Sequence, residues 1–100
     1  MAVSGVVPQI RTTDLDGSIQ FYVSKLGFEL AFKYEDFYAG IKVGDTFIHL
    51  KLVDDVDPSV AFVADGDHFH LYFMTDDVDA EARKLKSKGV VFRAEVADMP

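Results

Sequence analysis

The stretch TTDLDGSIQFYVSKLG, residues 12–27, determines the first helix and the limits of the elements beside it. Asp14 offers a side-chain N-cap to the backbone that follows it. Apolar residues then recur at helical spacing, at Ile19, Tyr22 and Leu26. Gly27 follows the last of them and is a typical glycine stop. The stretch therefore predicts a helix that begins after Asp14 and ends before Gly27.

Strands are predicted on both sides of this helix. Residues 6–12 precede it and are rich in β-formers, and Pro8 is typical of a strand start or an edge. Three more strands follow at 28–35, 37–43 and 46–53. Links as short as these permit only antiparallel neighbours, so the three strands form a meander. Residues 1–53 thus predict one β-α-β-β-β module.

Residues 54–67 interrupt this pattern. They hold a cluster of aspartates with no Lys or Arg, punctuated by Pro58 and Gly66. The composition predicts an acidic surface loop that connects two parts of the chain. Its apolar stretch, residues 60–63, is able to dock on the body of the protein or on a ligand.

The order of elements then begins again at TDDVDAEARKLKSKG, residues 75–89. A threonine, an aspartate cap, an apolar residue and an aspartate match residues 12–16 at an offset of 63 positions, and the serine-lysine-glycine ending matches after a one-residue deletion. Strands are predicted at 69–75 and 90–96, with a helix between them. The repeat indicates two related modules in a single domain, 1–100: the first module at 1–53, the acidic connector at 54–67, and an incomplete second module at 68–100.

The second module stops after β-α-β, two strands short of the first. These strands are truncated, lost or replaced by a partner chain. Each case leaves an exposed sheet edge, which proteins usually cover. We therefore expect a homodimer.

Composition narrows the class of protein. The chain carries a formal net charge of −7 and no cysteine, so a disulfide framework and a thiolate metal site are excluded. No basic stripe offsets the acidity, and nucleic acid is not an expected partner. No apolar run approaches the ~20 residues that cross a bilayer, and no signal peptide follows Met1. We expect a cytoplasmic protein without membrane association.

Two motifs carry a family resemblance. The run from Ile10 to Leu30, with its Phe-Tyr and Leu-Gly-Phe signatures, and the run from His70 to Asp79, with Asp-Asp-Val-Asp, resemble the openings of the two modules of the vicinal-oxygen-chelate superfamily. That superfamily includes glyoxalase, the bleomycin-resistance proteins and extradiol dioxygenases. The resemblance implies an α+β fold of tandem βαβββ modules, each with a curled mixed sheet and its helices outside. This chain departs from it because the second module lacks its last two strands.

Strand alternation, independently of the resemblance, sorts the side chains into two faces. In residues 46–53 an aliphatic face, Ile48, Leu50 and Leu52, is expected to meet a helix. The opposite, mixed face is typical of a largely apolar ligand site with a few orienting polar groups. The same reading of 6–12 and 69–75 gives the predicted ligand-binding residues Val7, Gln9, Arg11, Phe47, His49, Lys51, His70 and Tyr72. The alternative is that this face meets solvent or a dimer partner, with Arg11 and Lys51 reaching into water.

No cofactor is expected. The resemblance implies metal ligands in the first and last strand of each module, and those positions hold Val7, His70 and, near the third, His49 or Lys51. Two imidazoles fall short of the three protein ligands usual for a catalytic metal. His70 and His49 are therefore only weak candidates, unless Gln9, His68 or a partner chain completes the set.

The function predicted is that of a metal-free small-molecule binding protein, similar to the bleomycin-resistance branch and hence to antibiotic resistance. It would sequester an aromatic or amphipathic compound in a dimer-formed pocket, and no catalytic residue is assigned. One alternative is a metal-dependent lyase, isomerase or dioxygenase of the glyoxalase type, in which the ion polarises substrate oxygens. A second alternative is a non-catalytic assembly module.

Overall fold

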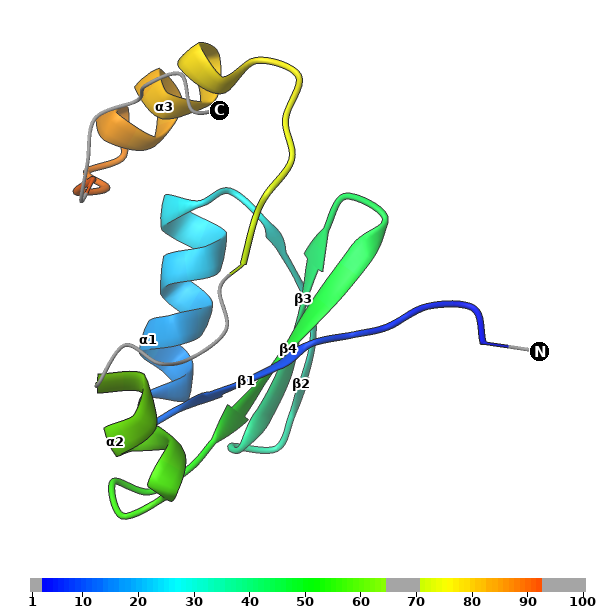
Figure 1. Cartoon of the computed structure of the whole chain (residues 1–100), viewed down its shortest axis with the longest axis vertical. Helices are drawn as coiled ribbons and strands as arrows, with labels where there is room; N and C mark the ends of the chain where they lie inside the picture. Colours follow the sequence, from blue (N-terminus) through cyan, green and yellow to red (C-terminus); the bar gives the residue numbers. More distant parts are fainter. Residues whose placement is uncertain (1–2, 65–70, 93–100) are drawn as a thin grey trace. The chain divides into compact units, whose positions relative to one another are not determined.

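The computed structural model describes residues 3–64 and 71–92, which belong to two compact units that divide between His68 and Phe69. The first unit holds β1 (Gln9–Thr12), α1 (Leu15–Gln20), η1 (Phe21–Lys25), β2 (Glu29–Tyr34), β3 (Tyr38–Val43), β4 (Thr46–Leu52) and α2 (Pro58–Ala64). The second holds α3 (Val78–Ser87) (Figure 1). The division falls beside the predicted start of the second module at 68.

The first unit is built on a four-stranded mixed sheet in the order β1-β4-β3-β2. Strands β2, β3 and β4 follow one another along the chain, and each pairs antiparallel with the next. This confirms the predicted meander. The first strand is separated from them by a helix, so it can pair in parallel, and it lies beside β4. The predicted α+β architecture of the first module, an open mixed sheet with its helices outside, is confirmed.

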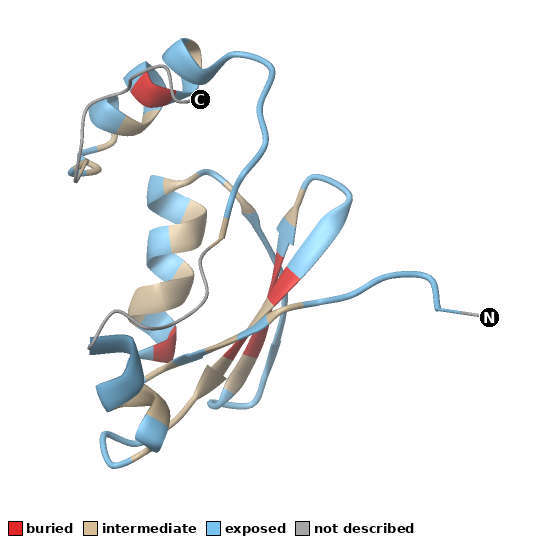
Figure 2. Ribbon diagram, viewed as in Figure 1, coloured by how far each residue is buried: buried red, intermediate tan, exposed pale blue. Residues whose placement is uncertain are grey.

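The core lies on one side of this sheet. Ala39 and Ile41 of β3 and Ile48 and Leu50 of β4 are buried there together with Leu15 of α1 (Figure 2). An ion pair on the same side joins Lys33 of β2 to Asp16 of α1, with 3.0 Å between Nζ and Oδ1. The aliphatic face of residues 46–53 therefore meets a helix, as alternation predicted. We call this side of the sheet the helix side.

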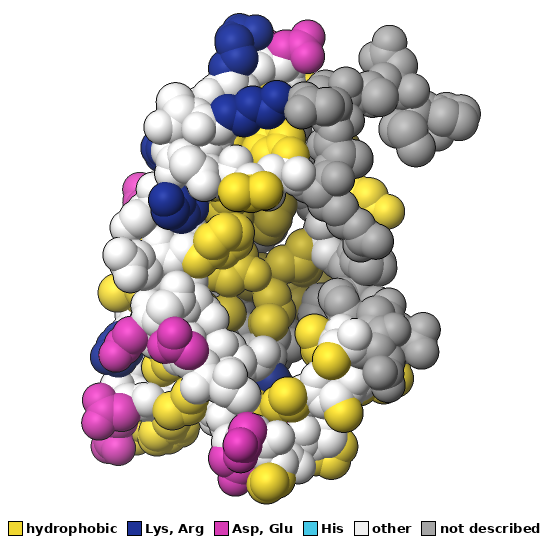
Figure 3. Space-filling model, turned by 90° about the vertical axis from the view of Figure 1, so that its left-hand side faces the viewer, with side chains coloured by type: hydrophobic (Ala, Val, Ile, Leu, Met, Phe, Trp, Pro, Cys, Tyr) yellow, Lys and Arg dark blue, Asp and Glu magenta, His cyan; other side chains and the backbone are white. Residues whose placement is uncertain are grey.

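Figure 3 views the molecule from the side on which α1 lies in Figure 1. Hydrophobic side chains are visible there among scattered acidic and basic ones, and no histidine of the described residues shows. By the register and burial pattern of the sheet, His49 is turned away from the buried face of β4. Within the described part of the chain, no helix is long and apolar enough to cross a membrane.

The two helices of the repeat begin in the same way. The Asp14 carboxylate accepts a hydrogen bond from Gly17 N at 3.0 Å, and the Asp77 carboxylate accepts one from Ala80 N at 3.0 Å. In each case the threonine two residues earlier accepts the N–H of the capping aspartate, at 3.1 Å and 3.3 Å. These positions differ by 63 along the chain, so the two helix starts share the same cap bonds at the offset of the sequence repeat.

The two helices also end alike but differ in length by one residue. Gly27 and Gly89 close them with φ of 80° and 82°, a conformation that glycine adopts at little cost. The longer first helix changes from α1 to the π-helical turn η1, in which Leu26 N donates to Phe21 O at 3.1 Å. A π-turn is the usual result of one extra residue in an α-helix. The extra residue of the first helix is therefore accommodated at η1.

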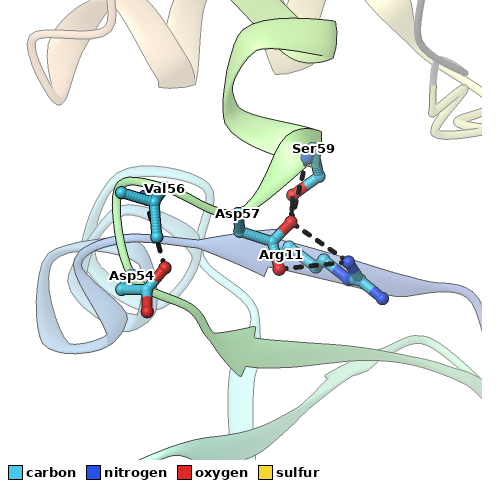
Figure 4. A network of polar contacts seen from close by, with 5 residues as sticks. All are labelled: Arg11, Asp54, Val56, Asp57 and Ser59. Carbon is cyan, nitrogen blue, oxygen red and sulfur yellow. Dashed lines mark hydrogen bonds and ion pairs between the residues drawn. The ribbon is translucent and has the colours of Figure 1, made fainter.

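The prediction that residues 54–67 form a loop is wrong for Pro58–Ala64, which form α2. Asp57 caps this helix: one carboxylate oxygen accepts bonds from Ser59 N at 2.9 Å and Ser59 Oγ at 2.6 Å (Figure 4). Pro58 then stands at the first helical position, where its missing N–H costs nothing. The aspartate that made the segment look like a solvated loop is the signal that starts the helix.

The predicted strands of the second module are also corrected. Residues 71–75 and 90–92 form no strand, while 69–70 and 93–96 lie outside the described residues. The first unit supplies the reason, because there β1 pairs with β4 and β2 with β3. Residues 71–75 and 90–92 correspond to β1 and β2, which do not pair with each other in the first unit. A strand without a ladder leaves its backbone groups unpaired and is not stable alone.

We predict that Asp57 stabilises the first unit in a pH-dependent way. Hydrogen bonds from Ser59, and then the Arg11 guanidinium, hold the pKa of the Asp57 carboxyl below its ordinary value. Its contribution is therefore complete above about pH 4, the ordinary pKa range, and is lost as the pH falls through the lower folded value. Asp57→Asn should reduce the urea midpoint of unfolding at pH 7, and the difference from wild type should shrink at pH 3.

The matched control is Asp55→Asn, because Asp55 is an exposed aspartate of the same segment. This control should leave the midpoint unchanged at both pH values. A loss for Asp57→Asn that is equally large at pH 7 and pH 3 would contradict the ionic role of this carboxylate.

Candidate functional site

Five of the predicted ligand-binding residues lie on one face of the sheet. Gln9 and Arg11 of β1 stand beside His49 and Lys51 of β4 in the parallel register. Phe47 lies two residues before His49 on β4, so its side chain is on the same side of the sheet. Because their neighbours Ile48 and Leu50 are buried on the helix side, these five residues face away from α1. We call this surface the open face.

The other three predicted residues are not brought to the open face by the sheet register. Val7 precedes β1 and is 44% exposed. His70 lies outside the described residues. Tyr72 belongs to the second unit, where it lies outside any strand and is 88% exposed. Their role in binding remains a prediction from the sequence.

Three rings form a cluster at the centre of the open face. Phe32 of β2 is stacked with Tyr38 of β3, with centroids 6.3 Å apart and planes at 18°. The His49 ring meets both edge-on, each centroid 5.3 Å away. Offset-stacked and edge-to-face contacts are the favourable geometries for such rings. Phe32 nevertheless remains 41% exposed, so the cluster presents an aromatic surface to whatever lies outside.

Gly40 makes this cluster possible. It pairs with Phe32 on one side and His49 on the other, so it occupies the centre of the three rings. A Cβ atom added at Gly40 would collide with the Phe32 ring. The glycine therefore lets Phe32 lie flat against the strand, which is the usual reason for a glycine inside a sheet.

A chain of hydrogen bonds crosses the same cluster. Gln9 Nε2 donates to the Tyr38 hydroxyl at 3.2 Å, and that hydroxyl lies 2.9 Å from His49 Nδ1. The three residues come from β1, β3 and β4, so the chain spans the middle of the sheet. Side chains linked in this way hold each other in one orientation.

The charged groups of the open face are mostly cationic, although the whole chain is acidic. Lys42 and Lys51 lie on it, and Glu29 is opposite Lys42 in the register. Neither lysine forms an ion pair with any residue that the structure describes. Lys51 is two residues from His49 on the same strand, hence about 7 Å along the face.

Arg11 has a partner of its own. Its Nη1 donates to both carboxylate oxygens of Asp57, at 3.1 Å and 3.3 Å, and so connects β1 to the start of α2 (Figure 4). This is the structural use of Arg11 that the sequence left open as an alternative to ligand recognition. Its side chain is 45% exposed, so the contact is a surface ion pair that orients α2.

The open face does not fit a divalent metal ion within residues 3–64 and 71–92. No three His, Cys, Asp or Glu side chains gather anywhere in these ranges. His49 is the one imidazole placed on the face, and its Nδ1 faces the Tyr38 hydroxyl. Its register partner in β1 is the amide Gln9, and the next residue of β4 on this face is Lys51; neither side chain supplies a carboxylate ligand.

Phe32, Tyr38 and Gly40 were not among the residues predicted for the site. Tyr38 and Gly40 follow from extending the alternation to residues 38–43, since they alternate with the buried Ala39 and Ile41. No pattern in the sequence indicates that Phe32 lies opposite Gly40 on the open face. The register between β2 and β3 shifts between Leu30 and Phe32, and this irregularity decides which side chain meets Gly40.

Several solved structures are similar in fold to this chain. The bleomycin-binding protein of Streptomyces verticillus, solved with copper(II)-bleomycin, has a TM-score of 0.68 and 25% identity over 88% of this chain and 66% of its own. TnmS3, an antibiotic-binding protein from Streptomyces sp. CB03234, has a TM-score of 0.68 and 28% identity over 91% and 75%. Lactoylglutathione lyase from Agrobacterium tumefaciens shares the fold at 18% identity and a TM-score of 0.60, over 91% and 74%.

The chain spans about two thirds of the length of the bleomycin-binding protein. A comparison with curated protein sequences gave no match. The family model for the Glyoxalase/Bleomycin resistance protein/Dioxygenase superfamily matches residues 6–100, nearly the whole sequence. Together with the βαβββ arrangement of the first unit, this match confirms the family resemblance carried by the two repeated motifs. The chain belongs to the Glyoxalase/Bleomycin resistance protein/Dioxygenase superfamily.

Proposed function

We propose that this protein binds a small aromatic or amphipathic compound on the open face, without a metal ion, in a pocket that a second copy of the chain completes. The observation that carries the proposal is the ring cluster of Phe32, Tyr38 and His49, held together on the solvent side of the sheet. Binding of small molecules is also what two similar structures, the bleomycin-binding and antibiotic-binding proteins, are named for.

The ring cluster is suited to binding because its three rings are not among the buried residues of the core. The buried apolar residues of the first unit lie on the helix side and fill the contact with α1. Phe32 and Phe47 of the open face are 41% and 37% exposed, although both are large and apolar. A flat ligand that stacks on Phe32 removes this surface from water, and each aromatic pair adds about 0.5–1.5 kcal/mol beyond the area term.

A second copy of the chain is proposed because one sheet face covers a ligand from one side only. Small-molecule sites usually bury most of the surface of their ligand. A second open face, brought over the first by a two-fold axis, would enclose the ligand between two ring clusters. A cytoplasmic location and a role in antibiotic resistance are parts of the same proposal.

The proposal is tested by titrating the protein with bleomycin and with 2-naphthyl compounds in a calorimeter, before and after EDTA treatment. We expect stoichiometric binding of at least one probe, unchanged by EDTA, and a dimer by sedimentation in the bound state. Phe32→Ala should weaken binding about tenfold, because it removes the stacking surface. The matched control is Phe21→Ala, which removes a ring of similar exposure, 44%, from the helical segment η1.

Two results would contradict the proposal. If no probe binds, the open face is not a ligand site. If EDTA abolishes binding and a divalent ion restores it, the protein depends on a metal, and the enzymatic alternative takes precedence.

A second prediction concerns Gly40. In Gly40→Ala the new methyl group collides with the Phe32 ring, which must leave its stacked position over Tyr38. We expect a loss of stability of about 1–3 kcal/mol and weaker binding of 2-naphthyl probes. The ring-current shifts of the Tyr38 and His49 protons in NMR spectra report the displacement directly.

The control for this variant is Gly5→Ala, because an added Cβ at Gly5 meets no atom within 4 Å. Unchanged Tyr38 and His49 shifts in Gly40→Ala would show that Phe32 does not rest on the glycine in solution.

A further inference from the structure

The direction of the hydrogen-bond chain on the open face determines what His49 offers to a ligand. Gln9 Nε2 can only donate, so the Tyr38 oxygen accepts from it. The Tyr38 hydroxyl lies 2.9 Å from His49 Nδ1. If its proton points to Nδ1, the hydroxyl donates and Nδ1 accepts. A neutral histidine that accepts at Nδ1 carries its proton at Nε2. With the Tyr38 proton directed at Nδ1, His49 offers an N–H donor at Nε2, which no described residue accepts.

The charges beside His49 favour the same kind of ligand. Lys51 lies two residues away on the same face, and Tyr38 and Arg11 are its register partners in β3 and β1. The Arg11 charge is shared with Asp57, whereas Lys51 has no ion-pair partner among the described residues. The acidic side chain that the strands place on this face, Glu29, is paired in register with Lys42 rather than with Lys51.

We propose that the open face selects an aromatic compound that carries an anionic oxygen, such as an aromatic carboxylate. Its ring stacks on Phe32, and its oxygen atoms accept hydrogen bonds from His49 Nε2 and Lys51 Nζ. Gln9 and Tyr38 are positioning residues, which act on the ligand through His49. This inference rests on the proposed function and names its ligand class. It also opposes the simple expectation that an acidic chain of net charge −7 prefers a cationic ligand.

The ligand class is tested with three probes that share one ring system: 2-naphthoate, neutral 2-naphthamide and the 2-naphthylmethylammonium cation. Calorimetric titration of the full chain at pH 7.5 should give about tenfold tighter binding of the naphthoate than of the cation, with the amide between them. Lys51→Gln should weaken naphthoate binding about fivefold and leave amide binding nearly unchanged. Lys33→Gln, which removes a lysine from the helix side of the same sheet, is the control and should change neither.

The positioning role is tested without a ligand. In long-range ¹H–¹⁵N NMR spectra of the wild type, His49 should show an unprotonated Nδ1 and a protonated Nε2, assigned by comparison with His49→Phe. Tyr38→Phe removes the hydroxyl that donates to Nδ1, and the two tautomers should then become mixed. The same variant should lower naphthoate affinity more than amide affinity, a split that a purely structural role of the hydroxyl would not produce.

The outcomes separate this inference from the proposed function. If the cation binds as tightly as the naphthoate, and Phe32→Ala weakens both, the open face is a binding site but the ligand class is wrong. A proton at Nδ1 of His49 in the wild type would likewise overturn the assigned direction of the chain. If none of the three naphthyl probes binds but bleomycin does, this inference fails and the proposed function stands. If bleomycin does not bind either, both fail.

Discussion

Strand β4 holds the first unit together because both of its edges are hydrogen bonded. It pairs in parallel with β1 and antiparallel with β3, so the last strand of the module lies between its first and its third strand. On the helix side this places Ile48 and Leu50 at the centre of the core. On the open face it places His49 between Gln9 and Gly40. The open face takes this form because the last strand of the module returns to lie beside the first.

The same constraint explains why the second unit differs from the first. Its capped helix α3 repeats the first helix bond for bond at its start, since a cap requires only neighbouring residues. The described parts of its predicted strands, residues 71–75 and 90–92, are not strands, and a strand requires a partner distant in sequence. In residues 71–92 the structure therefore shows the local features of the module, the capped helix and its glycine stop, and no strand. Helices and caps depend on short-range bonds, and this difference in range separates the two halves.

The open face combines features that the composition of the chain hides. The sequence is strongly acidic overall, yet the charges nearest the ring cluster are Lys51 and an arginine already paired with Asp57. Net charge describes the average surface and governs solubility and long-range attraction. Recognition depends on the few groups within hydrogen-bonding distance of a ligand. A protein can thus be anionic as a whole and still present a local site for an anion.

Much of this architecture could be predicted from the sequence, and the errors have a common origin. The Asp14 and Asp77 caps, the glycine stops, the meander and the two faces of β4 all follow from local spacing, and all are found in the structure. The helix at Pro58–Ala64 was missed because an acidic loop and a capped short helix begin with the same residues. Phe32 was missed because its position depends on a shift of register, which leaves no trace in the periodicity.

The π-turn at Phe21–Lys25 has a consequence for how the two halves diverged. Adding one residue to a regular helix rotates everything beyond it by about 100° around the axis and would misdirect the chain as it leaves. A single wide turn takes up that rotation, so Gly27 still closes the helix and β2 still begins on its proper side. Duplicated halves can therefore differ in length by one residue without a compensating change elsewhere. The middle of this helix is a place where an ancestral gene could gain or lose a codon at small cost to the protein.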